Sequence, residues 1–220
     1  MGVALVIPAA GSGSRFGGPV PKQYLPLAGR PVLAWTLEAF AGLVDEGLLA
    51  VDAAWEADAA ALAAAAPFPC RVVRGGATRQ ASVAAALAAV APAHDRVLVH
   101  DAVRPLVPRT CIEACIAALA DHPAAVVAVP CAATVKRAGP GDLVVATVPR
   151  DDLWLAQTPQ GLRRVEGLAA FAAAGDLLCT DDAQVMERAG HAVALVRGDA
   201  RNLKITTPDD FAVAEALLRR

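Results

Sequence analysis

The sequence predicts an α/β fold: a doubly wound, mainly parallel β-sheet with a protruding β-arm. Short apolar runs alternate with helical patterns from residue 3 to residue 129, and this alternation is typical of the βαβ units that build a parallel sheet. The alternation stops at residues 131–150, where Gly-Pro-Gly stands between β-forming residues, as in a hairpin. No repeat or linker divides residues 1–220, so we expect a single domain that carries the arm.

Each element is predicted from its own pattern. Apolar β-forming runs indicate strands, and apolar residues that recur every three or four positions indicate helices. Pro31 in a first turn and Thr207 as an N-cap mark two helix starts. The expected strands are residues 3–7, 48–51, 71–73, 96–100, 125–129, 192–196 and a short run at 203–205. The expected helices are residues 31–41, an alanine-rich segment after residue 53, residues 78–90 and 108–120, and three that begin near residues 163, 182 and 207.

The composition argues against several classes of protein. With 20 Lys and Arg against 22 Asp and Glu, the net charge is −2 and no block of like charge occurs, so we expect no nucleic-acid partner. The alanine-rich segment contains Glu56 and Asp58 and is too short to span a bilayer, so we expect no membrane partner. The first ten residues lack the basic region of a secretory signal, and we expect a cytoplasmic protein.

The five cysteines predict neither a disulfide framework nor a metal site. They are odd in number and form no Cys-x-x-Cys pair. Cys111 and Cys115 are spaced to share a helix face, but no histidine or third cysteine completes a metal set nearby. We expect small buried apolar side chains in a reducing compartment.

Residues 7–25 (IPAAGSGSRFGGPVPKQYL) follow the first expected strand, at the edge where parallel sheets bind ligands. The run at residues 11–16 begins like a dinucleotide fingerprint but ends in phenylalanine, and the Gly-Lys-Ser/Thr of a Walker loop is absent. What remains is a backbone suited to phosphate oxygens, to which Arg15 and Lys22 add positive charge. The alternative is a solvated surface loop.

Lysine is rare in this chain. Only Lys22, Lys136 and Lys204 are lysines, and every other basic residue is arginine. Lysine is a compact point charge and arginine a planar fork, so the few lysines are candidates for a specific task. Compositional drift is the alternative.

Residues 75–82 (GGATRQAS) follow the third expected strand. A glycine pair that opens a helix lets a flat ring approach the backbone, where helix N–H groups and the Ser82 hydroxyl can contact the edge of the ring. The alternative is an ordinary glycine turn with Thr78 as a cap.

Residues 99–105 (VHDAVRP) follow the fourth expected strand. Asp101 is placed to bind Mg²⁺, which takes few carboxylates and prefers phosphate oxygens, and Arg104 can form a bidentate contact with a phosphate. The alternative is an Asp–Arg surface pair. We expect His100 to pack or to fix the turn rather than to act as a base.

The remaining cations lie further along the chain. Lys204 stands in an apolar run, where a lysine costs free energy unless its ammonium group reaches an anion or water. Arg150 closes the arm, and Thr134 lies near its start. The candidate site thus contains several cations, one carboxylate and no nucleophile with its base; the cations are Arg15, Lys22, Arg104, Arg150 and Lys204.

This set of residues is suited to nucleotidyl or phosphoryl transfer. Its cations can neutralise a polyphosphate and stabilise the charge that builds up in the transition state. A phosphate monoester acceptor needs no general base, because its second pKa of about 6 makes it a dianion at neutral pH.

Five motifs in order resemble one known family: residues 9–25 (AAGSGSRFGGPVPKQYL), 99–105 (VHDAVRP), 157–160 (QTPQ), 180–183 (TDDA) and 202–206 (NLKIT). They are similar to those of the 2-C-methyl-D-erythritol 4-phosphate cytidylyltransferases of the non-mevalonate isoprenoid pathway, over essentially the whole chain. The resemblance implies a Rossmann-like nucleotidyltransferase fold, Mg²⁺ with CTP as substrate, and a homodimer that exchanges the arm at residues 131–150.

The resemblance also implies roles on the nucleotide side of the site. Arg15 and Lys22 would stabilise the transition state at the α-phosphate, and Gly76 and Ser82 would recognise cytosine. Asp101 would serve both the nucleotide and the metal. The loop that holds CTP would comprise Ala9, Ala10, Gly11, Ser12 and Gly13.

On the acceptor side, Lys204 and the partner subunit's Arg150 would position the sugar phosphate. The residues implied to line this pocket, some of them across the dimer, are Asp101, Arg104, Thr134, Thr158 and Thr180.

Two positions depart from the family's pattern, since Pro149 and Ala77 stand where an acidic residue is usual. Pro149 should stiffen the approach to Arg150, and Ala77 costs nothing if that position contributes only backbone. Three alternatives stay open: a cytidylyltransferase for another polyol phosphate such as ribitol 5-phosphate, a nicotinamide-dependent oxidoreductase, and a catalytically silent nucleotide-binding regulator. The missing third glycine counts against the oxidoreductase, and so does the expectation that no ribose-binding acid ends the second expected strand.

Overall fold

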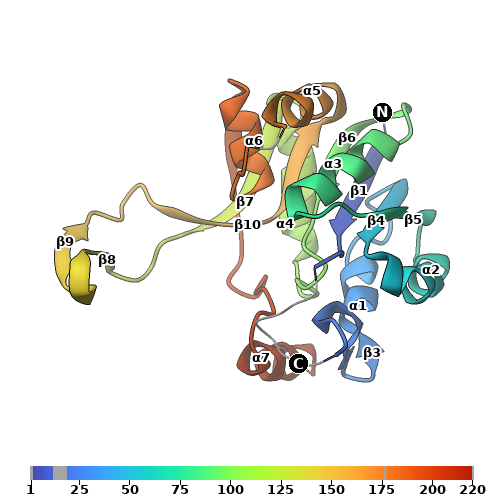
Figure 1. Ribbon diagram of the computed structural model, residues 1–220, viewed down its shortest axis with the longest axis horizontal. Coiled ribbons are helices and arrows are strands. Elements are labelled where there is room, and N and C mark those ends of the chain that lie inside the picture. The colour runs from blue at the N-terminus through green and yellow to red at the C-terminus, as the bar shows by residue number, and fades with distance from the viewer. Residues whose placement is uncertain (1, 12–18, 176, 220) are drawn as a thin grey trace.

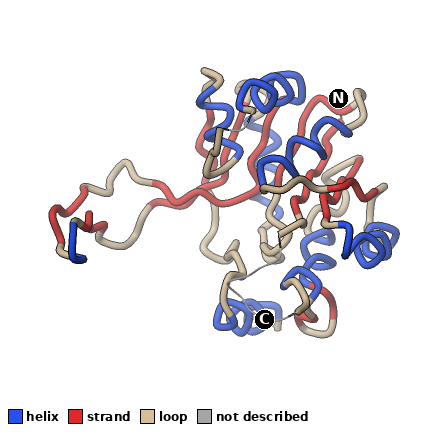
Figure 2. Tube along the Cα trace, viewed as in Figure 1, coloured by secondary structure: helices blue, strands red, loops and turns tan. Residues whose placement is uncertain are grey.

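The computed structural model describes residues 2–11, 19–175 and 177–219, which form an open seven-stranded sheet with helices on both faces (Figures 1 and 2). The strand order is β11–β7–β10–β6–β1–β4–β5. Neighbouring strands are parallel except at β10, which is antiparallel to both β6 and β7. The strands are β1 (Gly2–Pro8), β4 (Glu46–Val51), β5 (Cys70–Arg74), β6 (His94–Val99), β7 (Ala124–Pro130), β10 (Trp154–Arg163) and β11 (Val193–Arg197).

The central strand β1 accounts for the double covering of the sheet. Its residues Ala4, Leu5, Val6 and Ile7 are fully buried. Because successive side chains point to opposite faces of a strand, Leu5 and Ile7 join one apolar cluster while Ala4 and Val6 join another. The first cluster packs under α1 (Val32–Glu38), α2 (Glu56–Ala64) and α4 (Arg109–Ala118), and the second under α3 (Arg79–Ala89), α5 (Arg164–Ala174) and α6 (Asp182–Arg188). The predicted doubly wound, mainly parallel fold is confirmed.

Strand β10 departs from the βαβ pattern and brings the QTPQ motif into the sheet. Its pairing with β7 shifts register between Ala156 and Gln160. Gln160 lies opposite Val99, the last residue of β6. Residues 157–160 therefore lie beside the loop that contains Asp101.

The chain between β7 and β10 leaves the body as the predicted arm (Figure 1, yellow). Its outer part is an antiparallel hairpin of β8 (Val135–Ala138) and β9 (Val144–Val148). Gly141 in the turn has a φ of +69°, a left-handed conformation that favours glycine. Near this turn Leu143, Val144 and Val145 are 59–70% exposed, so the arm presents apolar side chains outward.

The C-terminal helix α7 (Pro208–Leu218) packs near a short hairpin of β2 (Pro26–Leu27) and β3 (Arg30–Pro31). It begins as predicted, with a capping box in which the Thr207 hydroxyl accepts from the Asp210 N–H and the Asp210 carboxylate accepts from the Thr207 N–H. Within the described residues, no helix has both the length and the apolar character needed to cross a membrane.

The predicted strand at residues 203–205 is wrong. These residues form no ladder; a bond from the Ile205 N–H to the Val103 carbonyl, 2.9 Å long, ties the segment to the loop after β6. The Ile205 side chain is fully buried in a small cluster with Leu27, Val32 and Val103. Its apolar character thus reflects loop packing rather than sheet pairing.

Candidate active site

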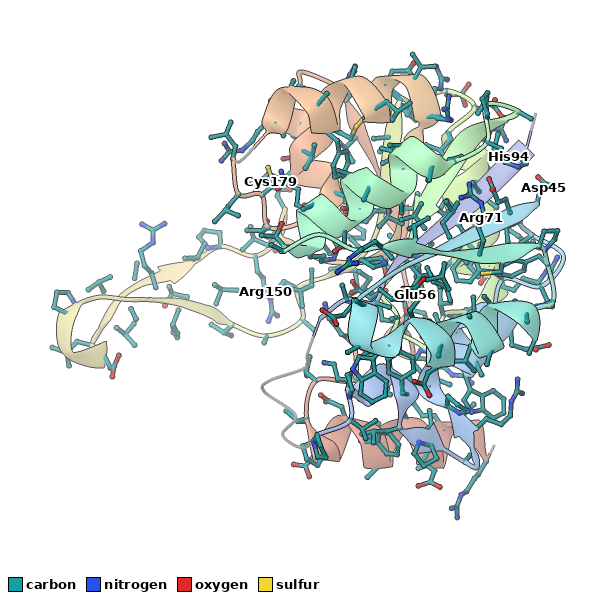
Figure 3. All side chains as sticks on the ribbon, turned by 45° about the vertical axis from the view of Figure 1, so that its right-hand side comes forward. Asp45, Glu56, Arg71, His94, Arg150 and Cys179 are labelled. Carbon is teal, nitrogen blue, oxygen red and sulfur yellow. The ribbon has the colours of Figure 1, made fainter. Side chains whose placement is uncertain are left out.

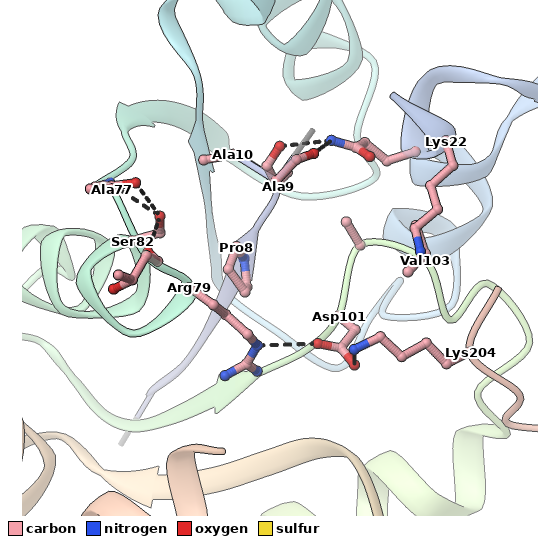
Figure 4. Close-up of a pocket in the computed structure, with 15 residues that line it drawn as sticks. Pro8, Ala9, Ala10, Lys22, Ala77, Arg79, Ser82, Asp101, Val103 and Lys204 are labelled. Carbon is pink, nitrogen blue, oxygen red and sulfur yellow. Dashed lines mark hydrogen bonds and ion pairs between the residues drawn. The ribbon is translucent and has the colours of Figure 1, made fainter. Parts of the chain in front are cut away.

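A cavity of about 250 Å³ opens beyond the carboxyl ends of β1, β5 and β6 (Figure 4). We call it the first cavity. This is the edge at which parallel sheets bind ligands, because the loops that follow the strands converge there. Sequence-predicted residues from five separate segments line it: Ala9, Ala10, Gly11, Lys22, Gly76, Ser82, Asp101 and Lys204.

Gln23 fixes the base of the glycine-rich loop. Its side chain is buried, and its Nε2 donates to the carbonyl of Ala9 at 2.8 Å and to that of Gly11 at 3.3 Å. The adjacent Lys22 extends its side chain along the cavity wall (Figure 4). No role was predicted for Gln23, which stands within residues 7–25, although its place directly after a candidate lysine was a signal. Arg15, Ser12 and Gly13 lie outside the described residues.

The loop between β5 and α3 is held in shape by Ser82. The Ser82 Oγ accepts from the Gly76 N–H at 3.1 Å and donates to the Thr78 carbonyl at 2.9 Å. A Cβ on Gly76 would lie 2.5 Å from the Cβ of Ala81, so this position requires glycine. Thr78 also caps α3 through the Ala81 N–H. The loop is therefore a glycine turn capped by Thr78, and it also forms one wall of the first cavity.

Asp101 is the centre of charge in the site. Its Oδ2 lies 3.0 Å from the Lys204 Nζ, and its Oδ1 lies 3.4 Å from the Arg79 Nε (Figure 4). The same Oδ2 lies 3.2 Å from the Arg104 Nε. Burial raises the pKa of this carboxyl, but Lys204, Arg79 and Arg104 outweigh that effect and hold the pKa far below its usual range. Asp101 is thus ionised at any physiological pH, within a site that keeps excess positive charge.

His100 fixes the turn, as the sequence predicts. Its Nε2 lies 3.1 Å from the Arg104 carbonyl, to which it donates, so Nδ1 is left to accept from the Thr158 hydroxyl at 2.9 Å. The same hydroxyl accepts from the Asp101 N–H at 3.1 Å. Burial lowers the pKa of His100 to about 4. A neutral, fully buried ring with both nitrogens engaged is a structural element rather than a general base.

A second cavity, of about 280 Å³, lies on the other side of Asp101. Its lining combines three cations with polar groups of β10 and of the loop before α6. Two predicted acceptor residues, Thr158 and Thr180, contribute to it together with Arg104. Three residues line both cavities: Arg79, Asp101 and Lys204.

Asn202 anchors the loop that carries Lys204. The Asn202 Nδ2 donates to the Thr158 carbonyl at 2.7 Å, and its own carbonyl accepts from the Arg104 Nη1 at 2.7 Å. The residue is fully buried. The sequence reading included Asn202 in the NLKIT motif but assigned it no role.

No role was predicted for Arg79 or Asp182, although they stand within residues 75–82 and 180–183. The Arg79 guanidinium forms a bidentate ion pair with Asp182, at 2.9 Å from Nη1 to Oδ1 and 2.8 Å from Nη2 to Oδ2. Burial disfavours the Arg79 cation, but Asp182 and Asp101 outweigh it and raise its pKa. Burial also raises the pKa of Asp182, and the Arg79 fork opposes that shift.

The arm residues lie apart from both cavities in the single chain. Arg150 is exposed at the base of the arm, on the side of the molecule opposite Asp45, Arg71 and His94 (Figure 3), and its Nη1 donates to the Ala132 carbonyl. Thr134 is exposed nearby on the arm. Of the predicted residues that the structure describes, it therefore brings together those of the body but not Thr134 or Arg150.

The two positions that depart from the family pattern lie in different places. Ala77 lines the first cavity, and Pro149 lies at the end of the arm next to Arg150. The expectation that no acid ends the second strand is wrong, because Asp52 directly follows β4, where dinucleotide-binding folds carry a ribose-binding acid. Its carboxylate instead accepts from the Ala54 N–H at 2.9 Å and caps a short turn, and it lines neither cavity.

The chain is similar to known proteins over its full length. The family model of 2-C-methyl-D-erythritol 4-phosphate cytidylyltransferase matches residues 3–220. A protein of that name from Symbiobacterium thermophilum is 49% identical, covering 98% of this chain and 92% of its own. The crystal structure of the protein of that name from Thermus thermophilus is similar, with a TM-score of 0.84, 38% identity and 100% of both chains covered.

A second solved structure is similar to the same extent. The 4-diphosphocytidyl-2C-methyl-D-erythritol synthase from Anaerococcus prevotii aligns with a TM-score of 0.85 and 31% identity, over 99% of this chain and 98% of that one. Sequence and fold thus agree over the full length. The chain belongs to the 2-C-methyl-D-erythritol 4-phosphate cytidylyltransferase family.

Proposed function

We propose that this protein transfers CMP from CTP to 2-C-methyl-D-erythritol 4-phosphate, giving 4-diphosphocytidyl-2-C-methyl-D-erythritol and pyrophosphate in isoprenoid precursor biosynthesis. The observation that carries the proposal is the arrangement of Lys22, Arg104 and Lys204 around two cavities that meet at one carboxylate, Asp101. Residues 1–220 act as one nucleotidyltransferase domain. Membership of the family supports the choice of both substrates.

CTP occupies the first cavity. The Gly76 backbone and the Ser82-braced loop contact cytosine, since both line this cavity. The triphosphate contacts Ala9, Ala10 and Gly11, which line this cavity, and Ser12 and Gly13 are further proposed ligands. Lys22 and Arg15 supply positive charge at the α-phosphate, where charge builds up in the transition state.

The acceptor phosphate occupies the second cavity, next to Arg104 and Lys204, and the polyol is contacted by Thr158 and Thr180. One oxygen of the dianionic phosphate attacks the α-phosphorus of CTP in line with the bond to the β-phosphate. That bond breaks and pyrophosphate leaves with the electron pair. No proton is transferred, so no base is needed, and His100 is not positioned to serve as one.

Mg²⁺ fits the first cavity as a cofactor held by Asp101. Asp101 is the carboxylate among the described residues that line this cavity, and Mg²⁺ commonly binds proteins through one or two carboxylates together with phosphate oxygens and water. Elsewhere in residues 2–11, 19–175 and 177–219, no group of three or more His, Cys, Asp or Glu side chains is suited to a metal. When bound, Mg²⁺ neutralises phosphate charge.

The active form is a homodimer in which each arm reaches the partner's body. The exposed Leu143, Val144 and Val145 near the arm turn give that association an apolar contact. Exchange brings the partner subunit's Arg150 to the acceptor phosphate, and Thr134 of the partner subunit to the pocket wall. All five cysteines are free thiols, which suits the reducing cytoplasm.

The reaction is tested by incubating the protein with CTP, Mg²⁺ and 2-C-methyl-D-erythritol 4-phosphate while pyrophosphate is measured. We expect release that requires all three additions and a product with the mass of the cytidine diphosphate ester. Tight CTP binding without pyrophosphate release would instead indicate a silent nucleotide-binding regulator. An acceptor-dependent absorbance change of a nicotinamide would indicate the oxidoreductase.

A further inference from the structure

Arg79 lies between the two cavities but is not free to follow a ligand. Its side chain is 33% exposed, lines both cavities, and comes from the first residue of α3, directly after the proposed cytosine loop. Both terminal nitrogens of its guanidinium are bonded to Asp182. The remaining Nε faces the Asp101 Oδ1 at 3.4 Å (Figure 4).

Asp182, the ion-pair partner of Arg79, is itself held in place by neighbouring groups. Asp182 is 2% exposed at the first position of α6. On either side of it, Gln160 of β10 accepts from the Ala183 N–H at 2.8 Å and donates to the Asp181 carboxylate at 2.9 Å. Arg79 is therefore anchored to a fixed part of the fold.

The other two cations that contact Asp101 are also proposed to bind substrate. Lys204, with a 38% exposed side chain, and Arg104 both contact the Oδ2 of Asp101, and both are proposed to bind the acceptor phosphate. A phosphate oxygen and Asp101 would compete for them. Arg79 cannot be drawn away in the same manner, because its fork is already bonded to Asp182.

We infer that Arg79, tethered by Asp182, is a positioning residue that keeps the Asp101 carboxylate aligned between the nucleotide and the acceptor while Lys204 and Arg104 engage phosphate. The inference rests on the proposed function and adds a residue to it. Arg79 acts through Asp101 and binds neither substrate. Loss of the tether therefore lowers kcat and leaves CTP affinity nearly unchanged, since misplacement of about 1 Å costs on the order of 100-fold in rate.

The test uses variants of the full chain in which the charge of Arg79 is removed alone or together with that of Asp182. Arg79→Gln alone leaves Asp182 buried without its partner and can destabilise the fold. The double variant Arg79→Gln/Asp182→Asn removes both charges and restores a neutral pair. Arg79→Lys keeps the charge but cannot reach both carboxylates as a fork. The matched control is Arg71→Gln/Glu46→Gln, an ion pair of 3.1 Å whose residues line neither cavity.

For each variant we measure the urea unfolding curve, CTP affinity by calorimetry without acceptor, and kcat. The double variant should regain stability relative to Arg79→Gln yet keep a kcat reduced about 10-fold or more, with a CTP dissociation constant within about threefold of the unsubstituted protein. Arg79→Lys should also be slow, and the control should retain full kcat.

Two results would overturn the inference. Full kcat in the stable double variant, or in Arg79→Lys, would make the ion pair a purely structural contact between α3 and α6. A loss of CTP affinity as large as the loss of kcat would make Arg79 a nucleotide ligand. Failure of the unsubstituted protein to release pyrophosphate would count against the proposed function instead, so the two failures are distinguishable.

Discussion

The ammonium group of Lys204 lies 3.0 Å from the carboxylate of Asp101, and this contact joins the loop after β11 to the loop after β6. The sequence places the two residues in different motifs, and the fold makes them neighbours at the boundary of both cavities. Asp101 satisfies the charge of a lysine that would otherwise be costly to keep in an apolar segment. In the proposed function the same lysine binds the acceptor phosphate.

Replacement of Lys204 by methionine should weaken acceptor binding. Methionine keeps much of the side-chain length but removes the charged donor, and a hydrogen bond to a charged group contributes about 1.5–3 kcal/mol, or roughly 10- to 100-fold. Steady-state assays should show a KM for the acceptor raised by that factor and a KM for CTP changed far less. Equal effects on both constants would contradict the proposed placement of Lys204.

Replacement of Lys22 by alanine should remove most of kcat and leave the fold intact. A positively charged donor aimed at the transition state is worth about 100-fold or more in kcat. The matched control is Arg219→Ala at the end of α7, an exposed cation that lies 3.0 Å from the Glu215 carboxylate and lines neither cavity. Near-normal turnover by the Lys22 variant, with an unchanged melting curve, would disprove the assigned role.

Exchange of the arms predicts that two inactive variants rescue each other. In a mixed dimer of Lys22→Ala and Arg150→Ala, one site would combine an intact Lys22 with the partner subunit's Arg150. If the two variants mix at random, half of the dimers are mixed, and one of the two sites in each mixed dimer is intact. The mixture should therefore show about a quarter of the activity of the unsubstituted protein. The measurement is pyrophosphate release after the two variants are unfolded and refolded together. If each site uses its own Arg150, the mixture will remain inactive.

The free energy of unfolding should decrease as the pH is lowered below the normal pKa of histidine. The folded state holds His100 neutral, with its pKa lowered to about 4, whereas the unfolded chain takes up that proton near pH 6.5. The contribution of the neutral His100 to the free energy of unfolding is complete above about pH 6.5. It is lost as the pH falls toward 4, with a slope of at most about 1.4 kcal/mol per pH unit. Urea unfolding between pH 4.5 and 8 measures it.

The exposed His122 provides the control for this pH dependence. His122→Gln should leave the pH dependence unchanged, and His100→Asn should flatten it in this window. The pKa of Asp101 is also lowered, so its contribution is present above the normal pKa of aspartate and is lost only at lower pH, outside the window. A flat curve for the unsubstituted protein would contradict the assignment of a neutral, buried His100.

Much of the fold was predictable because local patterns and tertiary packing agree. The run Ala4–Ile7 reads as a strand buried on both faces, and it is one. Strand β10 was not predictable as a ten-residue strand, because Pro159 lies in its middle and proline argues against a central strand. The register shift between Ala156 and Gln160 accommodates that proline. No local sequence pattern predicts such a shift.

The site was predictable where a motif carries its own chemistry. Asp101 and Lys204 were predicted from strand ends and unusual charge, and the structure places both at the two cavities. Arg79 and Asp182 were not, since each looks like an ordinary charged residue near a helix start until the fold places them 2.8 Å apart. Cross-subunit roles such as that of Arg150 depend on a partner and stay predictions.

The choice of acceptor tests the central claim most directly. The protein is incubated with CTP and Mg²⁺ and offered either 2-C-methyl-D-erythritol 4-phosphate or ribitol 5-phosphate, and the kcat/KM for pyrophosphate release is compared. We expect turnover with methylerythritol phosphate that exceeds turnover with ribitol phosphate by about 100-fold or more, the discrimination that misfitted hydroxyl contacts can supply. Release with ribitol phosphate and none with methylerythritol phosphate would contradict the account.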